Sequence, residues 1–86
     1  MFTLTVYGIP NCPNCETAKR IGTEKDCTVS YVDISQEGSE SRTQFEKDWE
    51  QYRKEPLPRA VPLIFVEELE QFMNFREFLS WIKTVL

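Results

Sequence analysis

The sequence contains no histidine, only three cysteines, and fewer basic than acidic residues. A structural zinc site usually needs four cysteine or histidine ligands, so a complete site of this kind is not expected within one chain. Ten lysines and arginines against 14 aspartates and glutamates give a net charge of -4. That balance argues against nucleic-acid binding, because contacts with phosphates need a basic surface.

Long hydrophobic runs are absent as well. The longest, such as residues 61–66, are far shorter than the roughly 20 residues that span a bilayer, so no contact with a membrane is expected. The first eight residues have neither a basic region nor a long apolar core, which predicts no signal peptide. An odd number of cysteines without a signal peptide favours a reducing compartment. We therefore expect a cytoplasmic protein (in the host cytoplasm if it is viral).

The 86 residues, of which 41% are apolar, suit a single domain over residues 1–86. Apolar, β-branched and aromatic residues predict strands at 2–7, 28–34 and 69–73, and a continuous apolar run predicts a central strand at 63–66. Helical spacing predicts three helices, at about 13–22, 40–53 and 75–86. We placed the end of the first helix at Gly22 and a tight turn at Glu67-Glu68. The order β-α-β-α-β-β-α predicts an α/β fold with a four-stranded mixed sheet and helices on both faces.

The sequence NCPNC at residues 11–15 places two cysteines, Cys12 and Cys15, three residues apart. Three interpretations compete: a redox pair, half of a metal site shared between two chains, or two inert core cysteines. The pair follows the first predicted strand in a turn that contains proline and asparagine, where side chains are usually accessible. This position favours redox chemistry.

Cys12 precedes a predicted helix, whose first N–H groups and dipole stabilise a negative charge. A thiolate there has a lowered pKa, which predicts that Cys12 is the nucleophile. Cys15 lies one turn further along and is expected to resolve the mixed disulfide. Pro13 makes the turn more rigid, and the small polar side chain of Asn14 leaves the cysteines accessible. Cys27 begins the second strand at the opposite end of the sheet, so we interpret it as a half-buried structural thiol.

The chain resembles the glutaredoxins, in particular the small phage and bacterial type. The resemblance rests on VYGIPNCPNCETAKR near the start and on RAVPLIFV at residues 59–66. It implies a thioredoxin-like fold and a cis peptide bond at Val61-Pro62 that faces the cysteines. It also implies that Val61 offers its backbone to an extended peptide or to glutathione.

The same resemblance places the substrate-binding residues. They are expected to be Pro13, Asn14, Arg59, Val61, Pro62, Met73 and Asn74. Ile9 stands where many members carry a glutathione-binding lysine, and Met73-Asn74 replaces a Gly-Gly pair. Side chains at positions 73 and 74 leave a ligand less room to approach the backbone than glycine does. Whether glutathione is a partner therefore stays open. A basic rim of Arg53, Lys54 and Arg59 offers an alternative contact for an anion.

We therefore predict a monomeric thiol-disulfide oxidoreductase with no bound cofactor and no metal. The resemblance implies glutathione as co-substrate and disulfide-bearing proteins, such as ribonucleotide reductase, as clients. Two alternatives stay open: a redoxin served by thioredoxin reductase without glutathione, and a redox-inactive binding module of the same fold. Tyr7 is expected either beside the active turn or as an ordinary strand aromatic.

Overall fold

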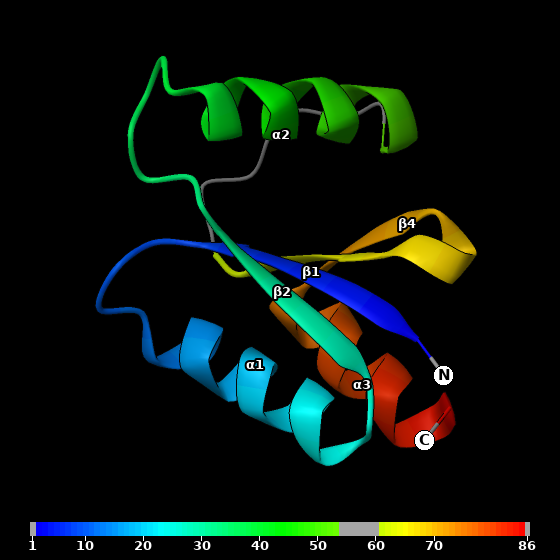
Figure 1. Ribbon diagram of the computed structural model, residues 1–86. Coiled ribbons are helices and arrows are strands. Elements are labelled where there is room, and N and C mark those ends of the chain that lie inside the picture. Colours follow the sequence, from blue (N-terminus) through cyan, green and yellow to red (C-terminus); the bar gives the residue numbers. More distant parts are fainter. Residues whose placement is uncertain (1, 54–60, 86) are drawn as a thin grey trace.

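The computed structural model describes residues 2–53 and 61–85 (Figure 1). Strands and helices alternate in the predicted order. The strands are β1 (Thr3–Gly8), β2 (Thr28–Asp33), β3 (Leu63–Val66) and β4 (Gln71–Asn74). The helices are α1 (Pro13–Glu24), α2 (Glu40–Tyr52) and α3 (Phe75–Val85), with a short 3-10 helix, η1 (Glu67–Leu69), between β3 and β4.

The four strands form one mixed sheet in the order β2-β1-β3-β4. Strands β1 and β2 are parallel, whereas β3 runs antiparallel to both β1 and β4. Helix α2 covers one face of the sheet, and α1 and α3 cover the other (Figure 1). The predicted α/β fold, with a mixed sheet flanked by three helices, is therefore confirmed.

The face under α1 and α3 has a mainly aliphatic core. Alternation along β1 directs Leu4 and Val6 to this side, where both are fully buried. The other buried members of this core are Ala18, Ile64, Val66, Met73, Phe78 and Ile82. Phe78 and Ile82 lie four residues apart on one side of α3, which is the spacing of an apolar helix face. This core fixes α1 against the carboxyl end of β1.

The face under α2 has a mainly aromatic core. Phe45 and Trp49, one turn apart on α2, pack on Phe72 of β4 with ring centroids 5.9 and 5.1 Å away. Tyr7 of β1 joins them, 4.8 Å from the ring of Phe45. Aromatic rings packed at such distances contribute beyond their buried area. Tyr52, further along the same side of α2, packs 5.0 Å from the ring of Phe65 and stays partly exposed at the edge.

Two predicted boundaries were wrong. Helix α1 continues through Gly22 to Glu24, and its end is marked by Asp26 in the left-handed conformation, with φ of 61°. A Cβ on Gly22 would lie 2.8 Å from Val29 and 3.0 Å from Leu4. Gly22 therefore permits close packing of the helix on the sheet, and is not a stop signal.

The second wrong boundary is the start of the last strand, because Leu69 belongs to η1 and is 41% exposed. The predicted tight turn at Glu67-Glu68 is the beginning of that 3-10 helix. Glu70 then reverses the chain with a φ of 51°, and the strand runs from Gln71 to Asn74. Alternation alone could not separate the exposed Leu69 from the buried residues that follow it.

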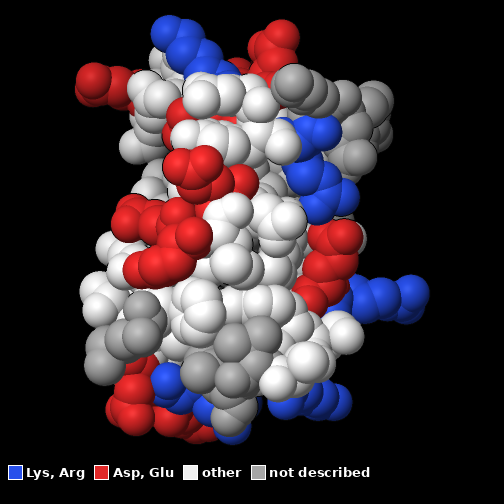
Figure 2. All heavy atoms as spheres, turned by 90° about the vertical axis from the view of Figure 1, so that its right-hand side faces the viewer, with Lys and Arg blue, Asp and Glu red and all other residues white. Residues whose placement is uncertain are grey.

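The surface on the β4 side of the molecule carries a band of acidic side chains beside uncharged atoms (Figure 2). The connection between β3 and β4 contributes to this charge, because Glu67, Glu68 and Glu70 lie within four residues and are all exposed. Such a face repels the phosphates of a nucleic acid. Within the described ranges, no helix has both the length and the apolar character needed to cross a membrane.

Gly22→Ala tests the close packing of α1. Alanine favours the helix by about 1 kcal/mol over glycine, but the new methyl group overlaps the stiff side chain of Val29. We expect the overlap to dominate and the free energy of unfolding in urea to fall by about 1–2 kcal/mol. Combining the change with Val29→Ala should recover part of the loss. A single variant as stable as the parent would contradict this account.

Candidate active site

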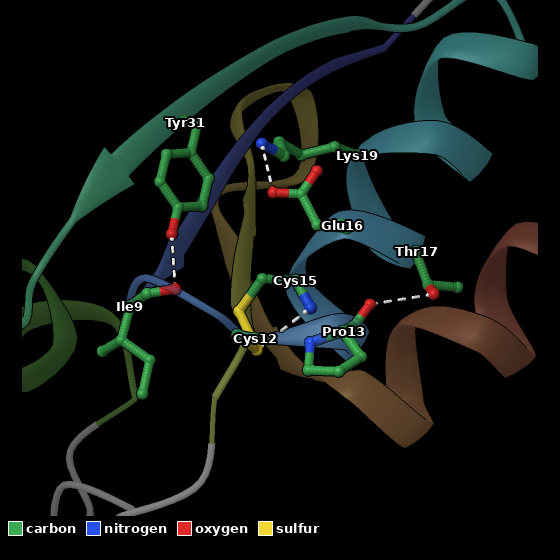
Figure 3. The surroundings of a disulfide bond; sticks show 8 residues. All are labelled: Ile9, Cys12, Pro13, Cys15, Glu16, Thr17, Lys19 and Tyr31. Atoms are coloured by element: carbon green, nitrogen blue, oxygen red, sulfur yellow. Dashed lines mark hydrogen bonds and ion pairs between the residues drawn. A yellow bond between two sulfur atoms is a disulfide. The ribbon is translucent and has the colours of Figure 1, made fainter.

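The two cysteines lie where the loop after β1 enters α1 (Figure 3). Cys12 is the N-cap residue of the helix, with extended backbone angles, and Pro13 occupies the first turn. The Cys12 Sγ accepts a hydrogen bond from the Cys15 N–H at 3.1 Å. A free N–H group at a helix start is thus directed at the sulfur, as required for stabilising a thiolate.

Cys12 and Cys15 are joined by a disulfide, with their Cα atoms 5.2 Å apart. Their exposures differ: Cys12 is partly exposed, whereas Cys15 is only 1% exposed. An open groove of about 440 Å³ leads to Cys12 and is lined by Asn11, Pro13 and Glu16. Only Cys12 is therefore open to a partner molecule in this state. Asn14, also predicted for the site, is exposed beside it.

Gly8, the last residue of β1, lies against the buried sulfur. A Cβ at Gly8 would be 2.5 Å from Cys15 Sγ and 3.1 Å from the Tyr31 hydroxyl oxygen. Because no real Cβ tolerates such a distance from a fixed sulfur, only glycine lets Cys15 pack at the end of the strand. Sequence reasoning had treated Gly8 only as the start of a loop.

Val61 and Pro62 lead into β3 at the same end of the sheet. Leu63 pairs with Tyr7, so the residue before it falls at the level of Gly8, next to the cysteines. The Val61-Pro62 peptide bond is cis, as the resemblance implied. Pro62 is buried and Val61 partly exposed. The sheet therefore brings the predicted proline and the cysteine pair to one end.

Met73 and Asn74 end β4 at this level too, because Asn74 pairs with Leu63. Met73 is 7% exposed and its side chain belongs to the aliphatic core, so that side chain is not available to a substrate. Asn74 caps α3: its Oδ1 accepts from the Glu77 N–H at 2.8 Å, and Glu77 Oε1 accepts from the Asn74 N–H at 2.9 Å. This is a reciprocal capping box.

Arg53, at the end of α2, reinforces that capping box. Its Nη1 donates to the Phe72 carbonyl oxygen and to Glu77 Oε1, both at 3.0 Å. The bond from the Asn74 N–H, together with Arg53, holds the pKa of the Glu77 carboxyl below its usual value, against the opposing effect of burial. Arg53 is thus engaged within the protein. Lys54 and Arg59, the other residues of the expected basic rim, lie outside the described residues.

A residue that sequence reasoning missed lies beside the cysteines. Tyr31 of β2 donates its hydroxyl hydrogen to the Ile9 carbonyl oxygen at 3.0 Å (Figure 3). Lys19 Nζ lies 4.3 Å from the centre of the Tyr31 ring and 3.0 Å from Glu16 Oε1. One indication was available in the sequence. Tyr31 lies in a strand parallel to β1, and the carboxyl ends of adjacent parallel strands meet at one edge of the sheet. Tyr7, which we had considered for this place, packs under α2 instead.

Cys27 is a free, half-buried thiol beside the aliphatic core, as predicted. It lies at the other end of the sheet, where neighbouring Thr28 pairs with Thr3. Burial raises the pKa of its thiol, which favours the less reactive, neutral form. Among residues 2–53 and 61–85, no three cysteine or carboxylate side chains come together in a way that suits a metal ion.

These features define a thioredoxin-like fold with a dithiol pair at the start of its first helix. Among solved structures, the chain is similar to glutaredoxin 1 from Francisella tularensis, a structure complexed with cacodylate. The TM-score is 0.70 with 22% sequence identity, over 99% of this chain and 96% of that one. This likeness establishes the glutaredoxin fold. No model of a protein family matches the chain, and no curated protein matches it.

Glu77→Gln tests the capping box. A carboxyl whose pKa is lower in the folded protein stabilises it above the unfolded pKa of about 4.3 and loses that effect as pH falls through the folded pKa. We expect the variant to lose about 1 kcal/mol of unfolding free energy at pH 7 and much less at pH 3. Urea unfolding at both pH values measures this difference. Glu50→Gln, at an exposed position of α2, is the control, and an equal loss there would contradict a specific role for Glu77.

Proposed function

We propose that this protein is a dithiol-disulfide oxidoreductase of the glutaredoxin type. The observation that carries the proposal is the asymmetry of the cysteine pair. Cys12 caps α1 and is partly exposed, whereas Cys15 is bonded to it and buried. An accessible sulfur at a helix N-terminus and a protected partner sulfur are what a nucleophile and a resolving thiol require.

In the proposed reaction, the reduced protein begins with a Cys12 thiolate. It attacks one sulfur of a substrate disulfide, forming a mixed disulfide and releasing the other sulfur as a thiolate, which takes up a proton. Cys15 then loses its proton and attacks the Cys12 sulfur, which releases the second substrate thiolate. Two electrons thus pass from the dithiol to the substrate, and the Cys12-Cys15 disulfide seen here is the product.

The reductant and the clients belong to the proposal. Glutathione, as a co-substrate that is not permanently bound, or a thioredoxin reductase would restore the dithiol. Glutathione mixed disulfides and disulfide-bearing proteins are the proposed substrates, with ribonucleotide reductase as the client implied by the resemblance. Support for an extended ligand comes from the groove at Cys12 and from the position of Val61 at the same end of the sheet.

We propose the cytoplasm as the location of the protein and a monomer as its working form.

Replacing each cysteine separates the two steps. Cys12→Ser should abolish turnover of a small glutathione mixed disulfide in a coupled glutathione reductase assay, and also insulin reduction with thioredoxin reductase. Cys15→Ser should still attack and should accumulate a mixed disulfide at Cys12, visible by mass spectrometry as an added substrate thiol. Cys27→Ser is the matched control and should keep nearly full activity.

The two assays also distinguish the reductants. Activity only with glutathione supports a glutaredoxin, and activity only with thioredoxin reductase supports a redoxin that does not use glutathione. A folded wild-type protein that is inactive in both assays, and that forms no mixed disulfide in the Cys15→Ser variant, would overturn the proposed function. It would favour a binding module instead.

A further inference from the structure

The loop that leads to Cys12, residues 9–11, is exposed to solvent. Ile9 is 38% exposed, Pro10 and Asn11 are exposed, and Asn11 adopts the left-handed conformation with φ of 59°. Within the described part of the chain, the bond from the Tyr31 hydroxyl to the Ile9 carbonyl oxygen is the hydrogen bond that ties residues 9–11 to the sheet. This contact therefore restrains the loop that leads to Cys12, whose sulfur is also bonded to Cys15 in this state.

The ring of Tyr31 is itself held from α1. Lys19 Nζ lies 4.3 Å from the ring centre, an attractive position for a cation over an aromatic face. Lys19 is in turn paired with Glu16, one turn earlier on the same helix. The contacts thus run from α1 to β2, from β2 to the loop, and through Cys12 back into α1. Figure 3 shows these side chains beside the disulfide, with dashed lines for the Tyr31–Ile9 bond and the Lys19–Glu16 pair.

Gly8 also gives Tyr31 room, because a Cβ on residue 8 would crowd the Tyr31 hydroxyl. That hydroxyl oxygen and Cys15 Sγ lie 3.1 and 2.5 Å from the point where the Cβ would be. Tyr31 therefore lies at the end of β1, close to both the buried sulfur and Ile9. With 37% of its surface exposed, it contributes little to the core, so packing alone does not explain its place.

We infer that Tyr31 is a positioning residue for Cys12, with Lys19 and Glu16 holding its ring. This inference rests on the proposed function and adds a residue that sets the reactivity of the nucleophile. By fixing the Ile9 carbonyl, Tyr31 keeps the Cys12 sulfur at 3.1 Å from the Cys15 N–H. Loss of the phenol hydroxyl frees the loop and weakens the stabilisation of the Cys12 thiolate.

Tyr31→Phe is the decisive variant, because it removes the hydroxyl and keeps the ring over which Lys19 lies. The test uses the reduced protein in a Cys15→Ser background, so that the only nearby thiol is Cys12. The pH dependence of Cys12 alkylation by iodoacetamide is followed by mass spectrometry of the peptide. The charged groups around Tyr31 are Lys19 and Glu16 from α1 and Asp33 from β2, and they are unchanged in the variant.

The expected result is a midpoint of the pH profile raised by about 0.3 to 1 pH unit, with alkylation two- to tenfold slower at pH values below the midpoint. This is the effect of one net hydrogen bond. Hydrogen exchange in the oxidised protein should accelerate by a similar factor at the amides of Cys15 and Glu16, which donate to the Cys12 sulfur and the Cys12 carbonyl oxygen. Tyr52→Phe is the matched control, since Tyr52 is 39% exposed and its hydroxyl makes no hydrogen bond to a described residue.

Unchanged exchange at the Cys15 and Glu16 amides and an unchanged alkylation profile in Tyr31→Phe would overturn the inference. Equal changes in Tyr52→Phe would overturn it too. So would slower turnover in the Cys15-containing protein without any change in the Cys15→Ser background, because Tyr31 would then act on Cys15. Failure of the proposed function looks different: the parent protein itself forms no mixed disulfide, whereas the exchange measurement still reports whether Tyr31 holds the loop.

Discussion

The contact between Gly8 and the Cys15 sulfur is the constraint on which the active end of this protein depends. It brings the first turn of α1 against the last residue of β1, closer than any side chain at residue 8 would allow. Cys15 is buried by that contact, and Cys12, three residues earlier, is left at the surface. The difference in exposure between two chemically identical sulfurs therefore depends on the absence of a side chain at residue 8 of the neighbouring strand.

The two cores of the sheet complement this constraint. On one face, aliphatic residues and Gly22 let α1 pack closely along its whole length, so that both of its ends are fixed against the sheet. On the other face, aromatic rings fill the wider space under α2. The site lies at the end of the sheet where β1, β3 and the start of α3 meet, and it is supported from both layers.

Much of this was predictable from the sequence, because strand alternation, helix periodicity and the Cys-x-x-Cys spacing are local patterns. The order of strands and helices along the chain and the position of Cys12 at a helix start agree with the predictions, and the cis bond before Pro62 agrees with what the resemblance implied. Contacts that depend on register were not predictable. Tyr31 meets Ile9 only because β1 and β2 pair as they do. Likewise, Arg53 was assigned to a basic rim for an anion, since its actual partners on β4 and α3 are distant in the sequence.

The contacts of Arg53 and Glu77 have a consequence for association between chains. Strand β4 is at the edge of the sheet, where unpaired backbone groups invite the addition of a foreign strand. Here the Phe72 carbonyl already accepts from Arg53, and the Asn74 N–H already donates to Glu77. An incoming strand would have to displace both side chains before it could pair. The interactions that fix the start of α3 thereby also guard the sheet against edge-to-edge aggregation.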